Sequence, residues 1–155
     1  MKFGRHTLVL GVAAFILASP LLARAVLMDT DRIQFNEVPG FVGITTATVE
    51  GDAAAGPHHS YMKMQAGFMA PLHHHTADHF VSVLAGTMIF NVDGVEYRLP
   101  AGSYFSFTEK QMHTTKCAEG EDCVLFLDAR DTWDVIMDAE SQADQTEVSA
   151  VGIAR

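Results

Sequence analysis

Residues 67–86 read GFMAPLHHHTADHFVSVLAG, and this stretch decides the fold. It contains two expected β-strands, at residues 70–75 and 79–85. Side chains on a strand point alternately to opposite sides, so His73 and His75 face one point while His74 faces away. The turn at residues 76–78 is short enough to bring His79, which opens the second strand, beside them.

A fourth histidine completes a candidate metal site. His113 belongs to a strand far along the chain, so it joins the others only if the strands close into a barrel. Imidazole nitrogen is a common ligand of divalent ions, and four imidazoles need no further protein ligand. Histidine runs also occur on solvated loops, but that alternative leaves the ligand spacing unexplained. The sequence therefore predicts one divalent transition-metal ion (Zn, Fe, Ni, Cu or Mn) held by His73, His75, His79 and His113.

The rest of the chain has the alternating strand and turn patterns of an all-β domain. Short runs rich in Val, Ile, Thr, Phe and Tyr recur with Gly, Pro, Asn or Asp between them, and no window keeps a helical period. Asp93-Gly94 is the clearest hairpin turn, because both residues tolerate a positive φ. The expected strands are residues 41–50, 60–66, 70–75, 79–85, 87–92, 95–99, 103–108, 111–116, 123–128 and 133–137. His58 and His59 are expected near the start of the second of these, outside the site.

Two cysteines, Cys117 and Cys123, flank a five-residue segment that looks like a hairpin loop. An oxidising compartment would let them form a disulfide, and two buried free thiols are the alternative. If they face each other across a hairpin, Thr115 opposes Leu125 and His113 opposes Leu127, all on one face.

The first 25 residues have the layout of a secretory signal peptide. Lys2 and Arg5 precede an apolar run, and an A-x-A sequence ends at Ala25, where cleavage is expected. An uncleaved signal anchor is the alternative. Cleavage predicts a periplasmic or secreted protein without stable membrane association.

The remaining chain forms one domain. It keeps 19 acidic residues and 7 of the 10 Lys and Arg, a formal net charge of −12 against −9 for the whole sequence. Such a surface repels phosphate backbones, which argues against nucleic acid as a partner. We expect one globular domain at residues 26–138 and a flexible acidic tail at 139–155. The tail could instead be a docking segment or an edge strand.

These motifs resemble those of the cupin superfamily. The spacing Gly67-x5-His73-x-His75-x3-His79-x6-Gly86 matches the first cupin motif, with His79 where most members have glutamate. The second motif matches more loosely: it has Gly102, Thr108 where proline is usual, Lys110 where glycine is usual, the ligand His113, and Cys117 where asparagine is usual. The resemblance covers about residues 33–137, and the chain looks most like the small single-domain cupins related to the zinc-binding cupin half of ChrR-type anti-sigma factors. It implies a double-stranded β-helix (jelly-roll) barrel and a homodimer.

The histidine at position 79 has a chemical consequence. Four neutral ligands leave the full 2+ charge on the ion, which predicts a stronger Lewis acid and a better binder of anions. The rest of the pocket is expected to be apolar and suited to a small organic ligand or O₂. Its expected inward residues are Met69, Val81, Val83, Leu125 and Leu127. Two polar sets, Tyr61, Lys63 and Gln65 on one strand and Tyr104 and Ser106 on another, are expected to face water; the alternative is that one of them reaches the pocket.

Two classes of function fit these features. One is a metal-dependent enzyme acting on a small molecule, with a dioxygenase or a related lyase or isomerase as the expected type. The other is a non-catalytic metal- or ligand-binding module, such as a periplasmic sensor. No catalytic residue beyond the metal ligands is recognisable in the sequence. The native metal would discriminate, since iron, nickel or copper favours oxygen chemistry and zinc does not.

Overall fold

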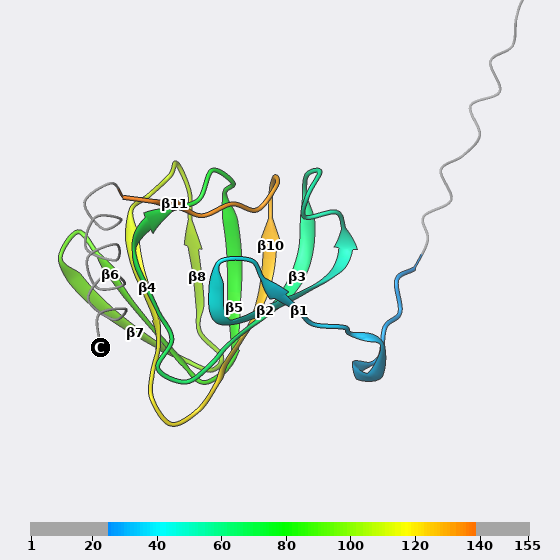
Figure 1. Ribbon diagram of the computed structural model, residues 1–155, viewed down its shortest axis with the longest axis horizontal. Coiled ribbons are helices and arrows are strands. Elements are labelled where there is room, and N and C mark those ends of the chain that lie inside the picture. Colours follow the sequence, from blue (N-terminus) through cyan, green and yellow to red (C-terminus); the bar gives the residue numbers. More distant parts are fainter. Residues whose placement is uncertain (1–24, 139–155) are drawn as a thin grey trace, which may run out of the picture.

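A computed structural model of the protein describes residues 25–138, which form two antiparallel sheets facing each other (Figure 1). The predicted signal peptide, up to residue 24, and the predicted acidic tail lie outside the described residues. Within residues 25–138, no helix is long and apolar enough to cross a membrane. The elements in chain order are η1 (Thr30–Arg32), β1 (Asn36–Val38), β2 (Phe41–Gly51), β3 (His58–Met64), β4 (Met69–His74), β5 (His79–Ala85), β6 (Thr87–Val92), β7 (Val95–Pro100), β8 (Tyr104–Phe107), β9 (His113–Cys117), β10 (Cys123–Ala129) and β11 (Ile136–Met137).

The chain passes repeatedly from one sheet to the other. One sheet has the order β1-β2-β3-β10-β5-β8, and the other has the order β11-β4-β9-β6-β7. The hairpin between β6 and β7 turns at Asp93 (φ 52°) and Gly94 (φ 80°), as predicted. The predicted all-β jelly-roll fold is therefore confirmed.

Alternation along the strands builds the core between the sheets. In β10 every second residue is buried, from Cys123 to Ala129, and the residues between them are half-buried. Leu125 and Leu127 pack inward with Val81 and Val83 of the neighbouring β5. Each such buried Val or Leu side chain contributes about 1.5–3 kcal/mol to folding. The core fills the space beneath the ends of the strands that carry the histidines.

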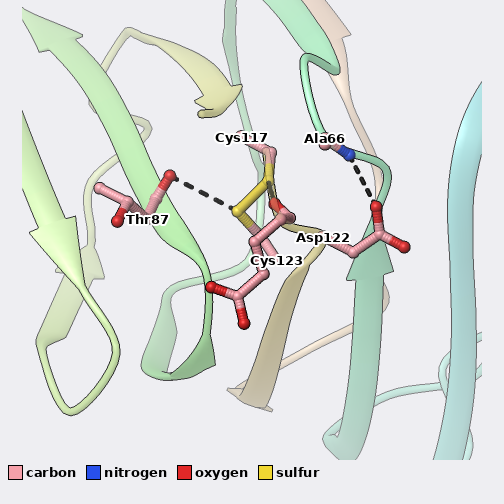
Figure 2. The surroundings of a disulfide bond; sticks show 6 residues. Ala66, Thr87, Cys117, Asp122 and Cys123 are labelled. Carbon is pink, nitrogen blue, oxygen red and sulfur yellow. Dashed lines mark hydrogen bonds between the residues drawn. A yellow bond between two sulfur atoms is a disulfide. The ribbon is translucent and has the colours of Figure 1, made fainter. Parts of the chain in front are cut away.

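The two cysteines are bonded, but they do not face each other across a hairpin. Their sulfur atoms are 2.08 Å apart (Figure 2). β9 and β10 belong to different sheets, so the predicted pairing of Thr115 with Leu125, and of His113 with Leu127, is wrong. Thr115 pairs instead with Ala70 and Phe90, and Leu125 with Met62 and Val83. The segment between the cysteines crosses from sheet to sheet, and the bond joins the sheets at the end of β9 opposite His113.

A bulge in β4 corrects one predicted core residue. Met69 is 67% exposed, although its spacing from His73 gave it inward parity. Between Ala70 and His73 the register against β9 gains one residue, so Ala70 and not Met69 points inward with His73. The bulge lies before His73, so His73 and His75 still face the interior.

The last part of the described chain crosses the barrel mouth. The predicted strand at residues 133–137 is reduced to β11, which pairs with β4. We call residues 130–135, between β10 and β11, the strap (Figure 1). Backbone hydrogen bonds tie it down: the Arg130 N–H donates to Asp78 O (2.9 Å) and the Trp133 N–H donates to Ala53 O (3.2 Å). The strap thereby covers one side of the histidine cluster.

Candidate metal centre

Three of the predicted ligands form a tight cluster. His73 lies on β4, His75 directly follows that strand and His113 opens β9. Each is buried and offers one ligand nitrogen, and these nitrogens all lie within 4.8 Å of one another. The pairing of His73 with His113 across the two strands fixes this arrangement.

His79 lies beside this cluster. It opens β5 in the other sheet and is 3% exposed. Its ring centroid lies 4.7 Å from that of His75 and 6.4 Å from that of His113. The fold therefore brings His79 to the same cavity as the other three histidines, on the opposite sheet.

Backbone carbonyls orient all four rings. Nδ1 of His73, His79 and His113 lies 2.6, 3.1 and 2.9 Å from the carbonyl oxygen two residues earlier in the chain. Nδ1 of His75 lies 2.5 Å from the Asp134 carbonyl of the strap. A carbonyl can only accept, so each Nδ1 carries the proton and donates, which leaves a lone pair on Nε2. Among the described residues, none donates a hydrogen bond to these four Nε2 atoms.

Burial keeps the four imidazoles neutral. Desolvation lowers the pKa of His75 to about 2 and that of His113 to about 4, with neighbouring histidines adding to the effect. It also lowers the pKa of His73 and His79. Metal ligands must be deprotonated, so the site meets this requirement at neutral pH.

Two aromatic side chains that sequence reasoning missed hold the rings in place. The Trp133 ring stacks on His75, with centroids 4.1 Å apart, and meets His79 edge-on at 5.0 Å. On the other side, the Phe107 ring stacks on His113 at 3.7 Å. Trp133 is the single tryptophan of the chain and stands among polar residues, which could have marked it as a functional side chain.

The histidines face an apolar cavity with about 60 Å³ of free space. A water molecule needs roughly 10–15 Å³ of such space, so the cavity has room for an ion and a short ligand. Within the described part of the chain, its only polar lining residues are the four histidines and Thr115. The apolar lining residues are Val38, Phe41, Ile44, Met62, Met64, Ala70, Val81, Met88, Phe90, Phe105, Phe107, Leu125, Leu127, Trp133 and Val135.

The other three histidines of residues 25–138 lie outside this cavity. His74 is half-buried on the outer side of β4, and His59 contacts Glu50 and Asp128 on the outer face of its sheet. His58 is buried at the start of β3, where its Nδ1 bonds the Gly56 carbonyl. The polar residues that were expected to face water are exposed or half-buried and do not line the cavity: Tyr61, Lys63, Gln65, Tyr104 and Ser106.

The donor set fits a divalent transition metal. Neutral imidazoles with free Nε2 lone pairs suit Zn, Fe, Ni and Cu, whereas Mn, Ca and Mg prefer oxygen ligands. Carbonyl partners on the far ring nitrogen are typical of metal-binding histidines, since they fix the tautomer. The three clustered histidines form a minimal site that His79 can complete.

Comparisons with known proteins agree on the fold. Residues 60–129 match the family model of the cupin domain, a segment that includes all four histidines. The polyketide cyclase RemF from Streptomyces resistomycificus superimposes with a TM-score of 0.63 at 17% identity, covering 74% of this chain and 85% of that chain. No curated protein sequence matches the chain.

Two further solved structures are similar over a shorter share of their own chains. The DMSP lyase DddQ from Ruegeria pomeroyi has a TM-score of 0.53 at 19% identity, covering 63% of this chain and 56% of that chain. A chain of the complex of SigE with the anti-sigma ChrR from Rhodobacter sphaeroides has a TM-score of 0.52 at 21% identity, covering 66% and 52%. Identities this low show a common fold only, so the function has to be inferred from the residues of the site.

Proposed function

The chain belongs to the cupin superfamily, and we propose that it is an exported metalloprotein that binds a small molecule at a four-histidine centre. In this proposal His73, His75, His79 and His113 hold one divalent transition-metal ion. The observation that carries it is the shared hydrogen-bonding pattern of the four rings, each with Nδ1 bonded to a backbone carbonyl and Nε2 left free.

The protein's own groups would prepare the site before any ligand arrives. The carbonyls of Pro71, Ala77, Gln111 and Asp134 hold the four tautomers, and Trp133 and Phe107 restrict the ring planes. Such pre-organisation reduces the ordering cost of binding. The apolar lining would keep bulk water from the small molecule.

We propose that the activity is that of a metal-dependent oxidoreductase of the dioxygenase type, or of a related lyase or isomerase. The ion would supply Lewis acidity and, if it is redox-active, a binding position for O₂. The described lining residues include no carboxylate or lysine, so this reaction would have to proceed without a protein base of that kind, which counts against catalysis. The similar fold of a polyketide cyclase and a DMSP lyase supports the hypothesis of an enzyme, because both of those proteins are enzymes with this fold.

A non-catalytic sensor or binding module is the second candidate. The similarity to a chain of the complex of SigE with the anti-sigma ChrR favours it, since that structure is a complex between two proteins. The native metal separates the two. Iron, nickel or copper in protein taken from its native compartment supports oxygen chemistry, and zinc supports the binding module.

Export and dimerisation complete the proposal. Cleavage after Ala25 would deliver residues 26–155 to the periplasm or the medium, where the bond between Cys117 and Cys123 is stable. Cell fractionation with N-terminal sequencing tests this, and a cytoplasmic protein that keeps Met1 would contradict it. The proposed homodimer predicts twice the chain mass in light scattering, and a chain that stays monomeric would contradict it.

Metal content tests the core of the proposal. Elemental analysis should find one divalent ion per chain in the purified parent protein and far less in His75→Ala. This variant loses one metal ligand but keeps the apolar core, so it should still fold. His74→Ala is the matched control, because its side chain is half-buried on the other side of the strand. Full metal retention by His75→Ala would refute the proposed centre.

A further inference from the structure

Thr115 carries the only hydroxyl group in the described lining of the cavity. It lies on β9 two residues after His113, so both side chains point inward and their Cα atoms are roughly 7 Å apart along the strand. Its partner across the β4 ladder is Ala70, whose small side chain leaves space beside the hydroxyl. Thr115 therefore belongs to the layer directly beneath the histidines.

The hydroxyl of Thr115 is available to a ligand. The residue is 6% exposed, and its Oγ1 makes no hydrogen bond to another described residue. No side-chain oxygen or nitrogen in the described part is both fully enclosed and unpartnered, so this Oγ1 reaches the open space of the cavity. A hydroxyl among methionine and phenylalanine side chains is costly unless something accepts its proton.

The second constraint is charge. Neutral imidazoles would leave the full 2+ charge of an ion uncompensated, and the described lining contains no Asp or Glu to balance it. In an apolar cavity such a charge favours an anionic ligand. The surrounding Met, Phe, Val and Leu side chains would in turn exclude a ligand that carries many hydroxyl groups or further charges.

From these two constraints we propose that the cavity selects a short monocarboxylate with an apolar body and one further hydrogen-bond acceptor. The carboxylate lies on the histidine side, and the Thr115 hydroxyl donates to the second acceptor. Thr115 is thus the residue that determines specificity. This inference rests on the proposed metal centre, so its test must report on metal and ligand separately.

Two acids of the same chain length test the role of the hydroxyl. Zinc-loaded protein (residues 26–155) is titrated calorimetrically with pentanoate and with 4-oxopentanoate, which adds one acceptor. We expect the parent protein to bind 4-oxopentanoate about three- to tenfold more tightly, the ratio that one net hydrogen bond produces. Thr115→Val keeps the shape and should abolish this preference, while pentanoate binds within about twofold of the parent.

Controls separate the hydroxyl from the fold and from the metal. Thr115→Ser keeps a hydroxyl and should keep the preference, as should Thr114→Val on the outward side of the same strand. A preference that survives in Thr115→Val, or its absence in the parent, overturns the inference. Failure of both acids to bind protein that holds one zinc per chain overturns the ligand class and leaves the metal centre intact. Failure of the parent to hold zinc refutes the metal centre itself.

Discussion

Replacing His79 with glutamate tests the charge of the candidate centre. The His79 ring is buried, 4.7 Å from the ring of His75 and 6.4 Å from that of His113. A carboxylate at this position and an anion bound among the other histidines would lie roughly 5–6 Å apart, where like unit charges repel by ~3 kcal/mol at an effective dielectric constant of about 20. Structural relaxation and water in the open cavity reduce this value. We therefore expect His79→Glu to bind a small carboxylate about ten- to a hundredfold more weakly than the parent.

The assay compares proteins that hold the same metal. Glutamate is itself a zinc ligand, so His79→Glu should still load one zinc per chain, which elemental analysis checks first. Calorimetric titration of pentanoate into the zinc-loaded parent and variant then measures the anion affinity. His79→Gln, which is neutral, serves as the control and should stay close to the parent if it retains zinc. Equal or tighter binding of pentanoate by His79→Glu would refute the argument from four neutral ligands.

Unfolding, fluorescence and thiol measurements test three other features of the structure. Burial lowers the pKa of His75 to about 2 and that of His113 to about 4, so both rings take up protons on unfolding below pH 6.5. The metal-free protein should therefore lose stability as the pH falls from 6.5 towards 4. The expected loss in the free energy of unfolding is about 1.4 kcal/mol per pH unit for each ring. Denaturant unfolding checks this, and an unchanged slope in His113→Gln would contradict it. Since Trp133 stacks on His75, Cu²⁺ should quench the emission of the parent protein but much less that of His75→Ala; equal quenching of both would place the metal elsewhere. The denatured, unreduced protein should show no titratable thiol, and reduction of Cys117–Cys123 should cost less than the ~3 kcal/mol of a fifteen-residue loop, whereas two titratable thiols would rule out the bond.

Local patterns predicted the strands and most of the inward faces. The strands at residues 79–85 and 87–92 agree with the structure at both ends, because turn residues and β-branched or aromatic runs mark them. Parity along β5 and β10 placed Val81, Val83, Leu125 and Leu127 inside without any knowledge of their partners. The common direction of His73 and His75 follows from the same local rule, since they lie two residues apart, whereas His113 joins them only through the closed barrel.

Features that depend on contacts between distant segments could not be predicted from local patterns. Nothing in the five residues between Cys117 and Cys123 distinguishes a hairpin loop from a crossover between sheets, because both need the same turn residues. The bulge that exposes Met69 arises from register against β9, which no local pattern records. The strap has no periodicity, so the contacts of Trp133 with His75 and His79 become visible only when the barrel is closed.

X-ray absorption spectroscopy of the zinc-loaded protein tests the central claim most directly, because it counts the ligands of the ion. We predict four nitrogen ligands at about 2.0–2.1 Å, with the outer scattering of four imidazoles. His79→Ala should lower that imidazole count to three and leave the other ligands in place. A sulfur ligand, fewer than three imidazoles in the parent, or an imidazole count that does not change in His79→Ala would contradict the four-histidine centre.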